Sequence, residues 1–320
     1  MKLLVLGHLC IDCAHPDGEP PRERWGGIAN TIAAIGALAG KEDTVLPVCG
    51  VGADDGKKFI SWLERFPAVD PSGVFTVNGP TNRIDFYEKG GGLRVACTQD
   101  IAPPIPFERI RKSLSVDGVL INMVSGSDIS LETLDQIRME VRARETPIHL
   151  DFHNLTTGIG EGRERFRRPL AEWRRWAFML TTVQLSEEEA SGLTVDRLTE
   201  VQLTGHLLTL GITGVLITRG PRGASVFANE HKKVVRYDIA GIPAEGAADR
   251  PGLGDVFGGA FLYRFVPTSD LRLSAEFANL TAAQAAARQA PIPGSTSEST
   301  PGSTPENTPE NKNDEWISPR

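Results

Sequence analysis

The sequence predicts an α/β protein with a central, mostly parallel sheet, helices on both of its faces and a small β lid. Three observations support this prediction. Apolar, strand-like runs alternate with amphipathic segments, which is typical of a parallel sheet covered on both faces. One stretch near residue 85 breaks this alternation with extended segments alone. The last residues of the 320-residue chain are too polar to join a core.

The strand-like runs are short and rich in β-branched and other apolar residues, as buried parallel strands are. They are Leu3–Leu6, Val45–Val48, Val119–Val124, Ile148–Asp151, Phe178–Leu180 and Val215–Thr218. Helices are expected between them at Ile28–Leu38, Lys57–Arg65, Leu131–Arg144, Arg163–Trp173, Glu187–Leu193 and Arg197–Leu210. Such a sheet holds its ligands at the carboxyl ends of its strands.

Extended segments without helices between them predict the lid, mainly at about residues 74–98, with a turn at residues 89–92. A second hairpin is expected at residues 222–237, turning at residues 229–231. Two further helices are expected at Gly254–Phe265 and Ser274–Gln289.

We expect residues 1–293 to form one domain and residues 294–320 to be a disordered tail. The tail has 15 Ser, Thr, Pro or Gly residues and only two large apolar ones, Trp316 and Ile317. Such a segment cannot bury enough apolar surface to offset its ordering entropy. It carries −3 of the formal net charge of −7, which leaves −4 for the domain.

Composition makes several classes of protein unlikely. No apolar run approaches the roughly 18 residues that a membrane span needs, so no membrane partner is expected. Four cysteines do not make a disulfide scaffold, and we expect a cytoplasmic protein. Residues 161–176 are rich in arginine and aromatic residues, but the acidic domain argues against nucleic-acid binding.

A run of potential metal ligands, His8-x-Cys10-x-x-Cys13-x-His15, lies near the amino terminus. Alternate residues of a strand point to opposite faces, so the four side chains are not expected to surround one zinc ion. We expect some of them to shape a pocket beside Asp12.

The segment at residues 249–260 carries the strongest chemical signal. Gly252 and Gly254 precede an apolar helical pattern, and Asp255 falls in its first turn. Glycines let the backbone approach a ligand, and a helix start favours a phosphate or a developing anion. Asp255 is then able to accept a proton from a bound hydroxyl.

Three other segments occur with it in a characteristic order. Gly7 and Asp12 follow the first strand, Gly26-Gly27-Ile28-Ala29-Asn30 opens a helix, and residues 218–223 end a late strand. Together with residues 249–255, the set resembles the PfkB (ribokinase-like) family of carbohydrate and nucleoside kinases. The resemblance covers about residues 2–290 and excludes the tail.

The resemblance implies an ATP-dependent kinase for a sugar or sugar-like hydroxyl. Asp255 matches the catalytic base, and the amides of Gly252, Leu253 and Gly254 match the anion hole for the transferring phosphoryl group. The family also implies the other contacts. The acceptor residues are Asp12, Gly26, Gly27 and Asn30; the nucleotide residues are Thr218, Arg219, Gly220, Gly223 and Asn279; Glu187, and Gln184 through water, would serve Mg²⁺.

The sequence departs from the family pattern at several positions. Gln184 replaces an Asn that often precedes Glu187, and Leu253 replaces a small residue. Arg250 replaces a Thr, which puts the monovalent-cation site in doubt. In the segment Asp151-Phe152-His153-Asn154, His153 replaces an Asn.

Two alternatives stay open beside the sugar kinase. One is a nucleoside kinase on the same fold, with Trp25 and Phe86 as walls for the base. The other is a catalytically inactive ligand-binding protein, suggested by Arg250, Leu253 and Gln184. The family's lid strands often pair between subunits, so a homodimer through the lid is expected. The acceptor's identity is not encoded in these motifs.

Overall fold

The computed structural model describes residues 1–16, 18–89, 93–243 and 251–287. Among these residues, one large sheet has the order β15-β14-β13-β12-β9-β8-β1-β4-β5. Its strands, in that order, are Lys233–Ala240, Gly223–Glu230, Gly214–Thr218, Thr182–Ser186, Ile148–Asp151, Gly118–Ile121, Lys2–Leu6, Thr44–Val51 and Val74–Thr76. Neighbouring strands are parallel from β13 to β5, whereas β14 is antiparallel to both of its neighbours, β13 and β15.

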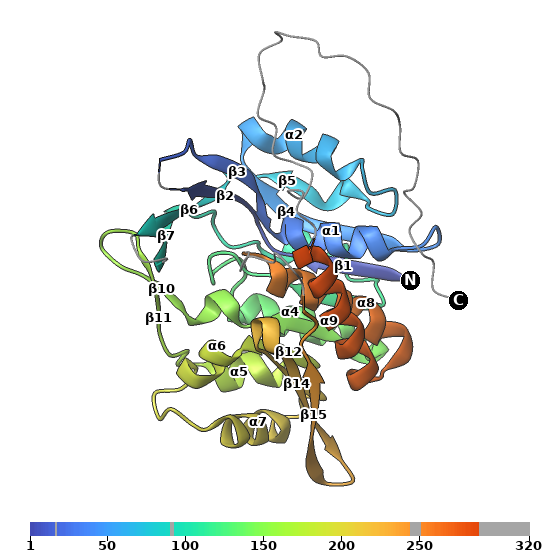
Figure 1. Cartoon of the computed structure of the whole chain (residues 1–320). Coiled ribbons are helices and arrows are strands. Elements are labelled where there is room, and N and C mark those ends of the chain that lie inside the picture. Colours follow the sequence, from blue (N-terminus) through green and yellow to red (C-terminus); the bar gives the residue numbers. More distant parts are fainter. Residues whose placement is uncertain (17, 90–92, 244–250, 288–320) are drawn as a thin grey trace, which may run out of the picture.

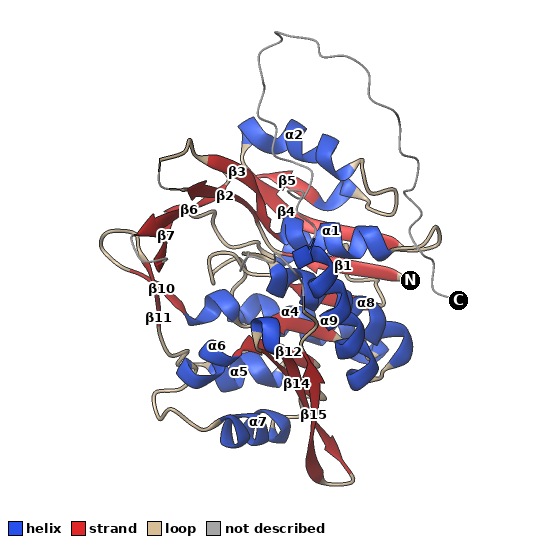
Figure 2. Cartoon of the chain, viewed as in Figure 1, coloured by secondary structure: helices blue, strands red, loops and turns tan. Residues whose placement is uncertain are grey.

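Helices cover both faces of this sheet (Figures 1 and 2). One face carries α1 (Ile28–Leu38), α2 (Ala53–Leu63), α8 (Leu253–Thr268) and α9 (Leu271–Ala287). The other carries α3 (Phe107–Arg111), α4 (Leu131–Val141), α5 (Trp173–Phe178), α6 (Glu187–Gly192) and α7 (Glu200–Thr209). Short 3-10 turns lie at Pro71–Gly73, Arg142–Arg144, His153–Thr156 and Gly220–Arg222.

Alternation along the strands divides the core into two layers. Leu3 and Val5 of β1 pack with α1 and α2, whereas Leu4 and Leu6 pack with the helices of the other face. All four are buried. Because successive strand residues point to opposite faces, an uninterrupted apolar run is what a doubly covered strand requires. The expected fold class is confirmed.

The lid is a separate four-stranded sheet in the order β3-β2-β6-β7. Its strands are β2 (Leu9–His15), β3 (Arg22–Gly27), β6 (Asn82–Lys89) and β7 (Leu93–Asp100). The sequence analysis placed the lid mainly at residues 74–98, and the structure adds the hairpin of β2 and β3. Val74–Thr76 instead forms the edge strand β5 of the large sheet.

Two expected elements were wrong. Residues 178–180 are not a strand, because α5 ends at Phe178 and the strand β12 begins only at Thr182. Residues 163–173 are not a helix, because Arg165–Arg167 form β11, which pairs with β10 (Thr157–Ile159). Pro169 lies within the expected helix and disfavours helical geometry at Arg168, the residue before it.

The expected turn at 89–92 falls largely outside the described residues, as do Asp249, Arg250 and the tail from residue 294. In the described part of the chain, none of the helices has the length and apolar character of a membrane span.

We expect Gly205→Ala to raise the free energy of unfolding by about 0.5–1 kcal/mol, because alanine is the better helix former. Gly205 lies inside α7, and a Cβ there meets no atom within 4 Å. Urea unfolding followed by circular dichroism measures the change.

Gly118→Ala is the matched control. A Cβ at Gly118 would lie 2.6 Å from Val266 Cγ2, so this variant should be less stable than the parent. An unchanged or lowered stability for Gly205→Ala would contradict the expectation.

Candidate functional site

The amino terminus of α8 begins with a left-handed glycine. Gly252 precedes the helix with a φ of 93°, a left-handed conformation that favours glycine. A Cβ on Gly252 would lie 2.4 Å from Asn30 Nδ2. Within the described residues, no side chain caps this helix. The first-turn amides of Leu253 and Gly254 therefore have no partner within the helix and can donate to a bound anion.

The carboxylate of Asp255 lies in this first turn and is held by two amides. Asn30 Nδ2 donates to Asp255 Oδ2 at 2.9 Å, and Asn122 Nδ2 donates to Oδ1 at 2.6 Å. Burial raises the pKa of Asp255, while the hydrogen bonds from Asn30 and Asn122 oppose that rise. The two amides thus fix the orientation of the carboxylate and favour its ionised form.

Asn122 was missed by the sequence analysis. It follows β8 directly, at the carboxyl end of a central strand, and is only 5% exposed. It also donates to Thr31 Oγ1 at 3.1 Å. A polar residue ending a buried strand was the available signal, since such ends line the ligand sites of parallel sheets.

Asn30, expected to hold the acceptor, instead donates its amide to Asp255. Its side chain is 2% exposed, and its Oδ1 has no hydrogen-bond partner among the described residues. A buried acceptor atom without a partner costs free energy. Oδ1 is therefore available to a hydroxyl donor that enters the site.

Asp12 lies on β2, on the face of the lid directed toward the start of α8. Its Oδ2 accepts from Arg24 Nη2 at 3.2 Å, and the same nitrogen donates to the Pro251 carbonyl at 2.7 Å. Burial raises the pKa of Asp12 to about 6, Arg24 opposes the rise, and nearby Asp255 adds to it. Arg24 thus connects the lid to the loop that starts α8.

The two glycines of the predicted acceptor motif have separate steric roles. A Cβ on Gly26 would lie 2.3 Å from the carboxylate atoms of Asp12. Gly27 has a φ of 56° and precedes α1, and a Cβ there would lie 2.3 Å from Val124 Cγ2. Both positions therefore require glycine for the lid and α1 to meet as they do.

A carboxylate–amide pair lies on the other side of the α8 start. Gln184 Nε2 donates to Asp151 Oδ2 at 2.8 Å and to the Gly254 carbonyl at 3.0 Å. Burial raises the pKa of Asp151 to about 7, and the charge of Glu189 adds to the rise. Gln184 is only 1% exposed and serves to position Asp151 against the first turn of α8.

Glu187 is paired with arginines in this structure. Its carboxylate accepts from Arg219 Nη1 at 2.6 Å and from Arg222. The hydrogen bond from Arg222 is the main cause of the lowered pKa of Glu187. Arg219 also binds Glu200 at 2.7 Å. Glu187 must therefore release an arginine before it can turn toward a metal ion.

A second ionic cluster, not predicted from the sequence, supports Asp151. His153 Nδ1 lies 2.7 Å from Glu189 Oε1, and Arg167 Nη2 lies 2.9 Å from the same oxygen. Burial alone would raise the pKa of Glu189, but the charges of His153 and Arg167 lower it to about 2. His153 also donates its backbone N–H to Asp151 Oδ1 at 3.0 Å.

The expected nucleotide residues lie around the end of β13 and the β14–β15 hairpin. Thr218 ends β13, Gly220 has a φ of 57° and Gly223 has a φ of 94°. A Cβ on Gly223 would lie 2.0 Å from the Ile239 carbonyl. Asn279 of α9 donates to the Ala240 carbonyl at 2.9 Å.

The structure thus brings one set of expected residues together and leaves another apart. Asn30 and Asp255 are in direct contact, and Asp255 is close enough to Asp12 for its charge to raise the pKa of Asp12. Asn279 and Glu187 have other partners, which are the Ala240 carbonyl at the end of β15 and Arg219 after β13. Arg250 falls outside the described residues.

Comparison with known proteins gives a consistent result. The family model of pfkB family carbohydrate kinases matches residues 166–298. None of the curated protein sequences matches the chain.

Solved structures of similar fold cover almost the whole chain. A pyrophosphate-dependent kinase of the ribokinase family, in complex with a pyrophosphate analogue and myo-inositol, is 18% identical with a TM-score of 0.73, covering 91% of this chain and 97% of that one. Ribokinase from Arabidopsis thaliana, in complex with ribose and ATP, is 21% identical with a TM-score of 0.68, covering 92% and 94%. Ribokinase from Thermotoga maritima is 20% identical with a TM-score of 0.68, covering 90% and 93%. These likenesses establish the fold.

We expect Gly26→Ala to lower the free energy of unfolding by about 1–3 kcal/mol, as overpacking of a filled site does. The added methyl group would overlap the Asp12 carboxylate. Denaturant unfolding of the full chain measures the loss.

Gly162→Ala is the control, because a Cβ at exposed Gly162 meets no atom within 4 Å. Equal stabilities of the two variants would show that Asp12 moves aside without cost.

Proposed function

We propose that this chain is a member of the pfkB family of carbohydrate kinases, whose family model matches residues 166–298, and that it transfers a phosphoryl group to a hydroxyl of a sugar or sugar-like alcohol. The family and its enzyme class, a sugar kinase phosphotransferase, agree with the expectation from the sequence. The observation that carries the proposed mechanism is the Asp255 carboxylate, fixed by Asn30 and Asn122 beside the uncapped start of α8.

Asp255 is proposed as the general base. Phosphoryl transfer depends mainly on positioning and on stabilisation of charge. A carboxylate held at both oxygens by amides has a defined direction in which to accept a hydroxyl proton. As the acceptor oxygen attacks phosphorus, its proton passes to Asp255 and the bond from phosphorus to the donor's leaving oxygen breaks.

The backbone amides at Gly252, Leu253 and Gly254 are proposed to stabilise the transferring phosphoryl group. Amides at a helix start carry partial positive charge and need no reorganisation during the reaction. The left-handed Gly252 and the uncapped helix support this role. Only the backbone N–H of Leu253 takes part, so this role requires its side chain to point away from the phosphoryl group.

The acceptor is proposed to lie between the lid and the start of α8. The Asp12 carboxylate accepts hydrogen bonds from hydroxyls, and Asn30 Oδ1 is a buried acceptor atom without a partner in the described chain. Two hydrogen-bond acceptors near Asp255 suit a polyol, which carries several hydroxyl donors. Gly26 leaves room for Asp12, and Gly27 lets α1 bring Asn30 into this space.

Mg²⁺ and ATP are proposed as cofactor and donor. Hard oxygen ligands suit Mg²⁺, and the residues near the anion site fit it, since Asp151 offers a carboxylate beside Gly254. Bound Mg²⁺ would neutralise charge on the donor phosphates. Glu187, with Gln184 supporting through water, would take part only after Glu187 leaves its arginines.

The phosphoryl donor needs its own test, because the solved relatives differ. One acts with pyrophosphate, and another is complexed with ATP. Thr218, Arg219, Gly220, Gly223 and Asn279 remain the proposed ATP contacts. Parallel assays with ATP and with pyrophosphate decide between the two donors.

The nucleoside-kinase alternative gains partial support from the lid. Ile84 pairs with Asp12, and Phe86 lies two residues beyond Ile84 on the same strand. The side chains of Phe86 and Asp12 therefore lie on the same face of the lid, the proposed acceptor face. Trp25 instead contacts Phe59 of α2, with ring centroids 5.8 Å apart. A panel of pentoses, hexoses, inositols and nucleosides distinguishes these acceptors, and turnover of any of them excludes an inactive binding protein.

A homodimer through the lid and a cytoplasmic location remain proposals.

We expect Asp255→Asn to lower kcat about 10²–10⁴-fold with whichever acceptor of the panel is best, because removal of a general base has that effect. Steady-state kinetics of the full chain measures it. Asp54→Asn, at an exposed position in the first turn of α2, is the matched control and should leave kcat unchanged. Activity of Asp255→Asn within about tenfold of the parent would refute the assignment of the base.

We expect the KM for the acceptor to rise as the pH falls through about 6. The pKa of Asp12 is raised by burial to about 6, so Asp12 is ionised above this pH and protonated below it. A protonated carboxyl is a weaker acceptor for hydroxyl donors. Acceptor KM profiles from pH 5 to 8 test this. A KM that is constant through pH 6 would show that Asp12 does not bind the acceptor.

A further inference from the structure

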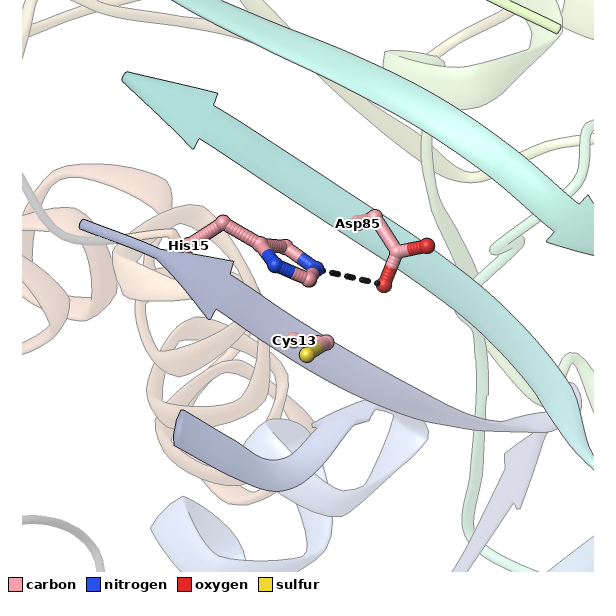
Figure 3. Close-up of side chains that lie close together, drawn as sticks. All are labelled: Cys13, His15 and Asp85. Atoms are coloured by element: carbon pink, nitrogen blue, oxygen red, sulfur yellow. Dashed lines mark hydrogen bonds and ion pairs between the residues drawn. The ribbon is translucent and has the colours of Figure 1, made fainter. Parts of the chain in front are cut away.

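The outer face of the lid brings together three side chains that the proposed reaction does not use. Cys13 and His15 are two residues apart on β2 and therefore point to the same face. Asp85 lies directly opposite Cys13 on β6. Figure 3 shows the three side chains gathered over these two strands. Asp12, the next residue to Cys13, points to the acceptor face instead.

The potential ligand atoms are close enough to share one ion. One atom from each of Cys13, His15 and Asp85 lies within 4.8 Å of the other two. His15 Nε2 is 3.2 Å from Asp85 Oδ1. The separation is fixed by the pairing of β2 with β6 rather than by a loop. The four potential ligands near the amino terminus are thus not all together, since His8 Nε2 lies 3.0 Å from the Pro103 carbonyl.

Neighbouring groups orient the three side chains. Cys13 and Asp85 are buried, while the side chain of His15 is 27% exposed. The His15 ring stacks on Tyr87 with centroids 4.5 Å apart. Arg83 Nε donates to Asp85 Oδ1 at 3.1 Å, and Nη1 of the same arginine donates to Glu23 at 2.6 Å. Such outer contacts fix ligand geometry in protein metal sites.

We propose that Cys13, His15 and Asp85 bind one zinc-like transition-metal dication, with the exposed side of His15 leaving room for a water as fourth ligand. Sulfur, imidazole nitrogen and carboxylate oxygen are the ligands that zinc takes in proteins. Binding would release the thiol proton of Cys13 and replace the contact between His15 and Asp85 with two bonds to the metal.

Charge on this face is compatible with a dication. The Cys13 thiolate and the Asp85 carboxylate supply two negative charges. Arg83 is a cation in contact with Asp85, and Glu23 offsets its charge through their ion pair at 2.6 Å. The competing interpretation is that Asp85 serves only to pair with His15 and Arg83, which predicts no affinity for metal.

The proposed metal would add bonds between two strands of the lid that are already joined by backbone hydrogen bonds and by the contacts of His15 with Asp85 and Tyr87. β2 and β6 are neighbours in the lid sheet. A ligand that binds only the folded protein stabilises it. The ion would therefore stiffen the strand that carries Asp12 without itself touching the acceptor face.

The experiment uses the full chain without a histidine tag, freed of metal by a chelator. Zn²⁺ is titrated in competition with a chromophoric chelator, and Co²⁺ is added separately to record thiolate-to-cobalt absorption. We expect one Zn²⁺ per chain and a charge-transfer band with Co²⁺. Cys13→Ser should remove the band and weaken Zn²⁺ binding at least about 100-fold, the upper range for loss of a supporting group. His15→Gln and Asp85→Asn should weaken it as well.

Cys97→Ser is the matched control. Cys97 lies on β7 opposite Asp85, on the same face of the lid as Cys13. The variant therefore removes one thiol from this face but leaves the three proposed ligands in place. It should retain the Co²⁺ band and the parent affinity. Circular dichroism of each variant checks that the lid still folds. The proposal is overturned if the parent binds no Zn²⁺ at micromolar metal, if Cys13→Ser binds as tightly as the parent, or if Cys97→Ser loses the metal.

Discussion

The site depends on one constraint. The backbone N–H groups in the first turn of α8 must stay uncapped, while residues from other elements hold the carboxylate of Asp255. Asn30 comes from α1 and Asn122 from the end of β8, and together they take both oxygens of Asp255. Gly252 allows α1 to approach this closely, because any Cβ there would overlap Asn30. The contact among Asn30, Asn122 and Asp255 therefore links the positions of α1, the end of β8 and α8.

A cation of the lid, Arg24, contacts this centre directly. Arg24 donates from the lid to the Pro251 carbonyl just before α8 and also to Asp12. Hydrogen bonds from charged donors are stronger than neutral ones. In the proposed reaction, the position of the acceptor ligand Asp12 and the position of the phosphoryl-binding loop are consequently set by the same side chain.

Much of the fold could be predicted from local patterns, and the failures have physical reasons. The helix at Ile28–Leu38 and the strand at Ile148–Asp151 were predicted with the observed bounds, since each has a clear period or a continuous apolar run. Residues 163–173 failed because their aromatic spacing is similar to a helical one, whereas β11 is set by pairing with β10. The hairpin of β2 and β3 was missed because its stability comes from β6, which is distant in sequence.

The site was predictable where backbone geometry determines chemistry and unpredictable where tertiary contacts do. Gly252 and Asp255 stand out in the sequence because a helix start with glycines has few other uses. Asn122 and Arg24 do not stand out, since only the folded chain brings them to Asp255 and Asp12. Glu187 stands out in the sequence, but its partners do not, because Arg219 and Arg222 come from the segment that follows β13.

The alternation of the lid strands also has an evolutionary consequence. Asp12 and Cys13 are neighbours in the chain but belong to opposite faces, one toward the acceptor and one toward the outside. In the proposed reaction, a substitution at Asp12 changes the acceptor face, whereas one at Cys13 or His15 changes the outer face of the lid. Selection for a new substrate and selection for a new outer surface can therefore act on the same seven-residue strand independently.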